Sequence, residues 1–197
     1  MKVAALIIGI DGCEQYTLPL VESIQKHEPD CQIVVIDNAS KEPYPALDYV
    51  HRTERLCYSA AINTAASHAT DADWLIVLSN DVLCTGRFFT LLRNLPKRAV
   101  YGQIVNVARY TFVMGWCVII PRPVWKSVGG WDENYVVSSW EDVDFSYMAR
   151  AAGFGVMDIP HMSFIHLDQR QRFYLPGFEG THDRNRAYFE AKHNLTR

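Results

Sequence analysis

The chain has 197 residues, of which 49% are hydrophobic and 21% charged, so one domain with a substantial buried core is expected. Its formal net charge of −3 provides no general electrostatic drive toward nucleic acid or anionic membranes. The five cysteines are scattered and include no CxxC pair, which indicates neither a zinc site nor a disulfide framework and favours a reducing cytoplasm. The apolar run at residues 3–10 is too short to span a membrane and does not resemble a signal peptide.

The first half of the chain alternates short apolar, β-rich runs with helical patterns. This alternation predicts an α/β fold with a mostly parallel, Rossmann-like central sheet flanked by helices. Strands are expected at residues 3–10, 32–37, 47–51 and 74–78, and helices at 17–27, 58–68 and 88–95.

The second half has a different pattern. It predicts a smaller acceptor-side sheet within the same single domain, so residues 1–95 form a nucleotide-binding half, 96–167 an acceptor half, and 168–197 a tail and helix. Strands are expected at 100–107, 111–120, 155–159 and 163–167, and helices at 123–128, 141–152 and 183–192.

Acidic side chains follow three of the predicted strands, and ligands bind beyond the carboxyl ends of such strands. Asp81 could bind a hard divalent cation that holds phosphate oxygens, or it could belong to a polar turn. Asp37 could contact a nucleobase or ribose, or form an Asx turn. Asp11 ends the first strand. A neutral imidazole at His166 could be a further metal ligand, or the residue could be structural, and His161 is a weaker rival.

The most informative stretch is residues 131–155. Glu141, Asp142 and Asp144 stand at the expected start of a helix, where acids are favourable because of the unpaired N–H groups and the helix dipole. The alternative is a site in which one carboxylate takes a proton from an alcohol. The neighbouring Trp131 and Trp140 could be core residues or could cradle a sugar ring. There is no GxGxxG fingerprint, Walker A loop or GxSxG elbow.

Together these motifs resemble the family 2 glycosyltransferases of the GT-A fold, in the same order along the chain. The resemblance covers most of the chain up to about Leu167, but the first acid of the family's DxD motif is replaced here by Ser79. The segments that carry it are residues 33–40 (IVVIDNAS), 58–65 (YSAAINTA), 74–82, 115–154 with GGWDE and EDVD, and 164–166 (FIH).

The resemblance implies transfer of a sugar from a nucleotide-diphosphate donor to an acceptor hydroxyl, with inversion. Asp142 is the expected general base, and Glu141 is the second candidate, which could instead bind the acceptor or tune the pKa of Asp142. Asp144 is expected to be structural. Asp81 and His166 would hold a divalent cation, Mn²⁺ or Mg²⁺. Donor-nucleotide contacts are expected from Asp11, Asp37, Asn38, Asn63 and Asn80, and acceptor or sugar contacts from Trp116, Trp131 and Trp140.

The acceptor is open at this stage. A saccharide or glycoconjugate is expected, and a hydroxymethylated pyrimidine in phage DNA is the alternative. The arginine-rich tail (Arg170, Arg172, Arg184 and Arg186) could contact phosphates, or it could be a solvated surface segment. Because of Ser79, a catalytically silent nucleotide-sugar-binding module is a third hypothesis. The sequence makes no prediction of oligomeric state.

Overall fold

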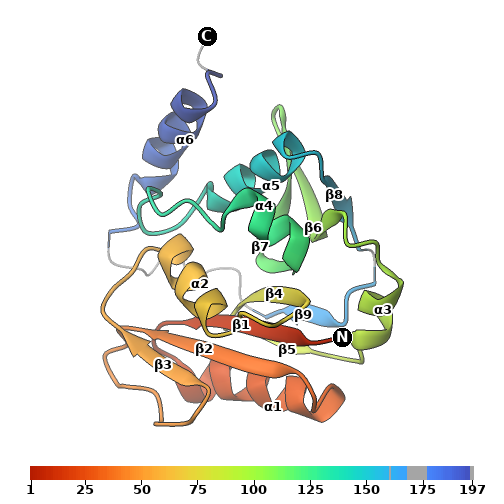
Figure 1. Cartoon of the computed structure of the whole chain (residues 1–197). Coiled ribbons are helices and arrows are strands. Elements are labelled where there is room, and N and C mark those ends of the chain that lie inside the picture. Colours follow the sequence, from red (N-terminus) through yellow and green to blue (C-terminus); the bar gives the residue numbers. More distant parts are fainter. Residues whose placement is uncertain (160, 168–176, 196–197) are drawn as a thin grey trace.

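The computed structural model describes residues 1–159, 161–167 and 177–195, and Figure 1 shows it as one α/β arrangement. Its main sheet has seven strands in the order β3-β2-β1-β4-β7-β6-β8. The pairs β1–β2, β1–β4, β2–β3 and β6–β8 are parallel, whereas β7 is antiparallel to both β4 and β6. The predicted mostly parallel central sheet flanked by helices is therefore confirmed.

The elements follow the sequence pattern closely, with boundaries that shift by a few residues. The first half contains β1 (Val3–Gly9), the π-helical turn η1 (Cys13–Thr17), α1 (Leu18–His27), β2 (Gln32–Asn38), β3 (Val50–Thr53), α2 (Tyr58–Ser67), β4 (Trp74–Ser79), β5 (Val82–Cys84) and α3 (Phe89–Asn94). The second half contains β6 (Ala99–Val107), β7 (Tyr110–Pro121), α4 (Arg122–Val128), α5 (Glu141–Ala151), β8 (Gly155–Asp158), β9 (Phe164–His166) and α6 (Thr181–Lys192).

Helices cover both faces of the sheet, and this explains why the central strands are continuous apolar runs. In β1, Ala5 and Ile7 pack with α1 on one face, whereas the alternate residues Leu6 and Ile8 pack with α2 on the other. The second core cluster also contains Phe145 of α5, so the face covered by α2 continues without interruption into the second half of the chain.

The carboxyl ends of the central parallel strands lie at one edge of the sheet. Gly9 is in register with Asp37, and Ile8 is in register with Ser79, so the ends of β1, β2 and β4 are neighbours. A small second sheet pairs β5 with β9 in antiparallel fashion and brings His166 beside Val82. This pairing places His166 near the carboxyl end of β4.

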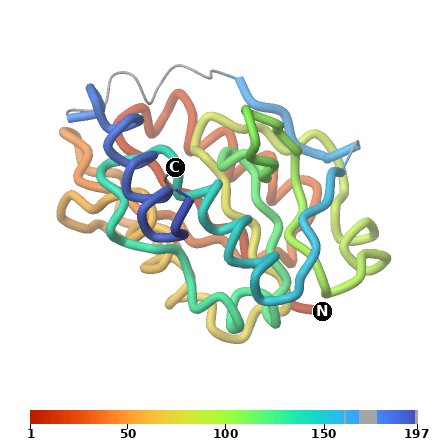
Figure 2. The backbone as a smooth tube through the Cα atoms, turned by 90° about the horizontal axis from the view of Figure 1, so that it is seen from above, coloured from red at the N-terminus to blue at the C-terminus, as the bar shows by residue number. Residues whose placement is uncertain are grey.

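Helix α6 lies against the segment that leads into α5, as both Figure 1 and Figure 2 show. Its C-terminal end is attached by a partly buried ionic cluster. Lys192 Nζ lies 2.7 Å from Asp132 Oδ2 and 2.8 Å from Asp144 Oδ2, and His193 Nε2 lies 2.6 Å from Asp144 Oδ1. Among the described residues, no helix is long and apolar enough to cross a membrane.

Candidate active site

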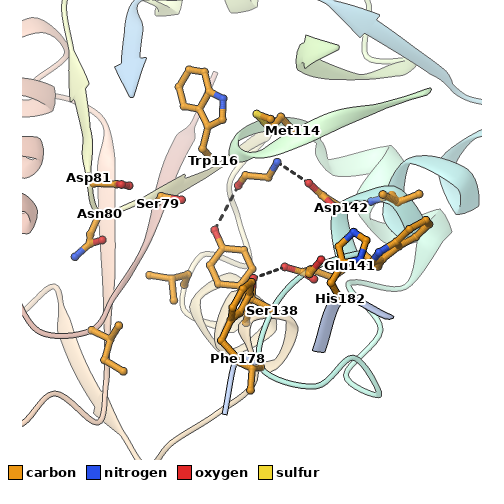
Figure 3. Close-up of a pocket in the computed structure, with 18 of the residues that line it drawn as sticks. Ser79, Asn80, Asp81, Met114, Trp116, Ser138, Glu141, Asp142, Phe178 and His182 are labelled. Atoms are coloured by element: carbon orange, nitrogen blue, oxygen red, sulfur yellow. Dashed lines mark hydrogen bonds between the residues drawn. The ribbon is translucent and has the colours of Figure 1, made fainter. Parts of the chain in front are cut away.

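A cavity of about 570 Å³ lies where the carboxyl ends of β1 and β4 meet the middle of β7 and the start of α5. Figure 3 shows its two chemically different ends. Ser79, Asn80, Asp81 and His166 line one end, which follows the strand edge, and Glu141 and Asp142 line the other. Side chains from both halves of the chain therefore face one cavity.

At the strand-edge end, Asp81 and His166 form a close pair. Asp81 Oδ2 and His166 Nε2 are 3.1 Å apart, and the backbone N–H of Leu167 donates to the Asp81 carbonyl oxygen at 2.8 Å. The indole ring of Trp116 stacks on the imidazole of His166, with ring centroids 5.3 Å apart and planes 3° from parallel. The stack and the β5–β9 pairing fix the position of the imidazole ring.

The donor set suits a hard divalent cation held jointly with a bound ligand. A carboxylate and an imidazole are suitable protein ligands, and Mn²⁺ or Mg²⁺ commonly takes its remaining ligands from phosphate oxygens and water. His166 Nδ1 is buried without a hydrogen-bond partner in the described part of the chain. An imidazole with its hydrogen on Nδ1 would leave the Nε2 lone pair for a metal. No group of three acidic, histidine or cysteine ligands occurs among the described residues.

At the other end, the carboxylate of Asp142 is held against β7. Asp142 Oδ2 accepts a hydrogen bond from Gly115 N at 2.9 Å, and Oδ1 accepts one from Val143 N at 2.9 Å. A Cβ atom at position 115 would lie 3.2 Å from Asp142 Oδ2, so a glycine lets the strand approach the carboxylate closely. The Tyr58 hydroxyl donates to the Gly115 carbonyl oxygen at 3.4 Å on the opposite side of the same residue.

Glu141 has a different environment from its neighbour. Burial, followed by the charge of Asp142, raises the pKa of Glu141 to about 8, although the Ser138 hydroxyl and nearby backbone N–H groups act in the opposite direction. Glu141 Oε1 accepts a hydrogen bond from Ser138 Oγ at 2.8 Å, whereas the buried Oε2 has no partner in the described structure. Burial therefore favours the protonated form of Glu141, whereas the two N–H groups that donate to Asp142 favour the charged form of that carboxylate.

Of the predicted donor-nucleotide residues, Asn38 and Asn80 line the cavity, and Asp11, Asp37 and Asn63 do not. Asp37 is fully buried and accepts hydrogen bonds from Ser40 N, Tyr44 N and Arg52 Nη1. Burial alone would raise the pKa of Asp37, but these hydrogen bonds outweigh it and lower the pKa. Asp11 accepts from Lys41 N at 2.8 Å. Asp37 and Asp11 thus organise the loop after β2.

Asn63 lies on α2 and bonds to the loop that follows α4. Its Oδ1 accepts from Trp131 N at 2.9 Å, and its Nδ2 donates to the Trp131 carbonyl oxygen and to Glu133 Oε1, both at 2.8 Å. The structure therefore gives Asn63 protein partners outside the cavity.

The three predicted acceptor-binding tryptophans have different positions. Trp116 and Trp140 line the cavity, and Trp140 packs edge-on against Tyr110 with ring centroids 5.3 Å apart. Trp131 is buried in the core and stacks on Phe145, with ring centroids 5.1 Å apart and planes 17° from parallel. Trp131 does not line the cavity, because its ring packs in the core between α2 and α5.

Sequence reasoning missed six cavity-lining residues with polar groups: Arg55, Tyr58, Tyr110, Ser138, Ser139 and His182. Tyr58 belongs to a segment that drew attention only through Asn63, and no motif distinguishes Ser138. His182 lies in the first turn of α6, far along the chain from the acidic segment. Their participation depends on tertiary contacts that local patterns do not encode.

The fold and the site together define an α/β protein with a paired carboxylate and imidazole at the strand edge and two further acidic side chains at the opposite end of one cavity. Residues 6–146 match the family described as Glycosyl transferase family 2. The chain belongs to this family. No match was found among curated protein sequences.

Solved glycosyltransferase structures have the same fold. A mannosyltransferase from Pyrobaculum calidifontis in complex with GDP-Man and Mn²⁺ matches 100% of this chain with a TM-score of 0.70 and 17% identity. GalNAc-T7 with UDP, GalNAc and Mn²⁺ matches 97% of this chain with a TM-score of 0.74 and 13% identity. The TarS protein of S. aureus matches 88%, with a TM-score of 0.64 and 15% identity. The chain spans 65%, 48% and 38% of these three structures, respectively.

Proposed function

We propose that this protein is an inverting glycosyltransferase that moves a sugar from a nucleotide-diphosphate sugar to an acceptor hydroxyl. The observation that carries the proposal is that one cavity holds both the Asp81–His166 pair and the hydrogen-bonded carboxylate of Asp142. Membership of the family supports it, and so do the nucleotide and Mn²⁺ present in two of the similar structures. We place the reaction in the cytoplasm, in keeping with the five free cysteines.

In this mechanism each end of the cavity has its own task. Asp81 and His166 would hold a divalent cation, Mn²⁺ or Mg²⁺, which supplies positive charge to the diphosphate leaving group. Asn38 and Asn80 would contact the nucleotide. Asp142 accepts the proton of the acceptor hydroxyl as its oxygen attacks the anomeric carbon from the face opposite the leaving group, which inverts the configuration.

The wall near the base indicates what kind of acceptor the cavity takes. Alternate residues of the β6–β7 hairpin present one apolar strip: Val105, Val107, Tyr110, Phe112, Met114 and Trp116. From Tyr110 to Trp116 the strip is about 20 Å long at roughly 3.3 Å per residue, which exceeds one sugar ring. A glycoconjugate with an apolar group beside its reacting hydroxyl fits this wall.

A DNA acceptor fits the cavity less well. Among the described residues that line it, Arg55 carries the only guanidinium group and no lysine is present. Arg186 bonds to Glu190 at 3.1 Å and does not line the cavity. Arg170 and Arg172 lie outside the described residues.

A thermal-shift panel of nucleotide sugars with and without Mn²⁺ tests the donor half of the proposal. A ligand at 100 times its Kd stabilises the fold by about 2.7 kcal/mol, which for a chain of this size raises Tm by about 5–10 °C. We expect the preferred donor to reach this shift only with Mn²⁺, and Asp81→Asn and His166→Ala to remove the Mn²⁺-dependent part. If no nucleotide sugar shifts Tm in the presence of Mn²⁺, the proposal is wrong.

The variant Asp142→Asn tests the base. Asparagine keeps the size of the side chain but cannot take up a proton, so transfer at saturating donor should fall at least about 100-fold. The Kd for the donor nucleotide should stay within a few-fold. Asp183→Asn, at a carboxyl group 95% exposed on α6, is the matched control. Near-normal turnover of Asp142→Asn would refute the base assignment, and binding without transfer by the unaltered chain would indicate a silent module.

A further inference from the structure

The loop before α5 has an unusual backbone. Val137, Ser139 and Trp140 have φ angles of 56°, 103° and 74°, in the left-handed region that favours glycine. For the β-branched Val137 this conformation is a true outlier. Such conformations persist only when the surrounding structure holds them in place.

The side chain of Asn185, in α6, holds the loop in this conformation. This side chain is buried, and its Oδ1 accepts a hydrogen bond from Val136 N at 3.0 Å. Its Nδ2 donates to the carbonyl oxygens of Val136 at 3.0 Å and Ser139 at 2.9 Å, with a longer contact of 3.4 Å to that of Ser138. Within the described part of the chain, every hydrogen bond of this amide group is therefore made to the backbone of one loop.

The same helix also holds the side chain of Trp140. The indole ring lies 5.4 Å from the ring of Phe189 and 5.7 Å from that of His182, measured between centroids. The guanidinium carbon of Arg186 lies 5.9 Å from the Trp140 ring centroid. Helix α6 thus fixes the loop through both its backbone and its largest side chain.

The loop connects α6 to the acidic end of the cavity. Val137, Ser138, Ser139 and Trp140 all line the cavity, and Ser138 Oγ donates to Glu141 Oε1 at 2.8 Å. The Val137 carbonyl oxygen accepts from Tyr58 N at 2.8 Å, which attaches the loop to the start of α2. A change in the loop would therefore move the wall beside Glu141 and Asp142 but not the Asp81–His166 pair.

We propose that Asn185 is a positioning residue of the acceptor site, which holds the strained loop of residues 136–140 in the conformation that shapes the cavity beside Asp142. This role rests on the proposed glycosyl transfer. Helix α6 lies beyond residues 6–146, which match the family. The contacts of Asn185 with the loop therefore come from outside the segment that matches the family.

Amide hydrogen exchange of the full chain tests whether Asn185 holds the loop of residues 136–140, and the experiment needs no substrate. The Tyr58 amide is the reporter, because it donates a hydrogen bond to Val137, whereas Asn185 bonds to Val136, Ser138 and Ser139. In Asn185→Ala we expect its exchange to be at least about tenfold faster, since the loop opens locally, while amides in β1 keep their protection. Asn94→Ala is the matched control, because Asn94 is an exposed asparagine at the end of α3. Unchanged Tyr58 protection in Asn185→Ala would overturn the proposal.

Kinetics then test the consequence for the site. With a preferred donor and acceptor, Asn185→Ala should lower kcat/KM for the acceptor by about 10- to 100-fold, the size of effect expected from a remote misplacement. Its Kd for UDP or GDP with Mn²⁺ should stay within about threefold of that of the unaltered chain, since donor contacts lie at the strand edge. A loss of nucleotide affinity equal to the loss of transfer would contradict a role confined to the acceptor site.

The variant Asn185→Asp is a second test of the same proposal, for use if Asn185→Ala does not fold. Aspartate keeps the volume and the acceptor for Val136 N, but its carboxylate cannot donate to the three carbonyl oxygens. We expect fast Tyr58 exchange at pH 8 and partial recovery of protection near pH 5, where a raised pKa in this buried position returns a proton to the group. Protection equal to that of the unaltered chain at pH 8 would overturn the proposal. If the unaltered chain binds no nucleotide, the exchange result still decides whether Asn185 holds the loop of residues 136–140.

Discussion

Glu141, Asp142 and Asp144 lie within one turn of α5, yet their carboxyl groups have three different environments. Asp142 accepts two backbone N–H bonds and lines the cavity, and Glu141 is buried with one oxygen unpartnered. Asp144 does not line the cavity and bonds to Lys192 and His193. The three acids of this segment are therefore structurally distinct, and the catalytic roles of Asp142 and Glu141 stay predictions.

Glu141 makes the stability of the fold depend on pH. Its pKa rises from 4.5 to about 8 on folding, so between these values the folded chain holds a proton that the unfolded chain has released. The free energy of unfolding should therefore fall as pH rises from about 5 to 8. Glu141→Gln removes this pH-dependent contribution to the free energy of unfolding. Between pH 5 and 8.5 we expect the stability of the variant to improve relative to the unaltered chain by a few kcal/mol, as measured by urea unfolding.

Glu42→Gln, at an exposed glutamate, is the control for loss of a surface carboxyl group. Its stability should follow that of the unaltered chain at each pH. If the curve for Glu141→Gln also runs parallel to that of the unaltered chain, Glu141 is ionised in the folded state and the assigned protonation is wrong.

At the level of elements, the sequence predicts most of the strands and helices, because most of them have a local hydrophobic pattern that is typical of one kind of element. The apolar runs of β1, β2 and β4 are buried on both faces, so their hydrophobicity is continuous and easy to recognise. β3 is less buried, and it begins at Val50 and not at residue 47 because its register is set by pairing with β2. The three-residue β5 was missed, because it exists only through its pairing with β9.

The candidate site is predictable only in part, for a related physical reason. Asp81, His166, Glu141 and Asp142 were identifiable because strand ends and helix starts are local features, and all four line the cavity. Their assigned roles stay predictions. The hydrogen bonds between Asn185 and residues 136–140 join segments about 45 residues apart in the sequence. They are made to the backbone of the loop, so they leave no periodic or compositional signal in its sequence.

At the level of the whole molecule, the two halves share one sheet and one core. β4 pairs with β1 on one side and with β7 on the other, so the sheet continues from the first half of the chain into the second. One core cluster includes Leu6 and Val34 of the first half together with Val118 and Phe145 of the second. The cavity is therefore lined by two parts of one structure, and its two ends keep their separation only while that sheet is intact.

This shared core predicts that the chain unfolds in one cooperative transition, as the expectation of a single domain requires. Calorimetry should show one peak with an enthalpy of about 140 kcal/mol near 60 °C and equal van 't Hoff and calorimetric values. Phe145→Ala removes a buried ring from the acceptor half and should cost about 3–5 kcal/mol. Because the core is common, we expect this variant to lower the Tm of the whole chain, including the β1 amides as followed by hydrogen exchange. Two resolved transitions, or loss of protection confined to the acceptor half, would show that the halves are separate folding units.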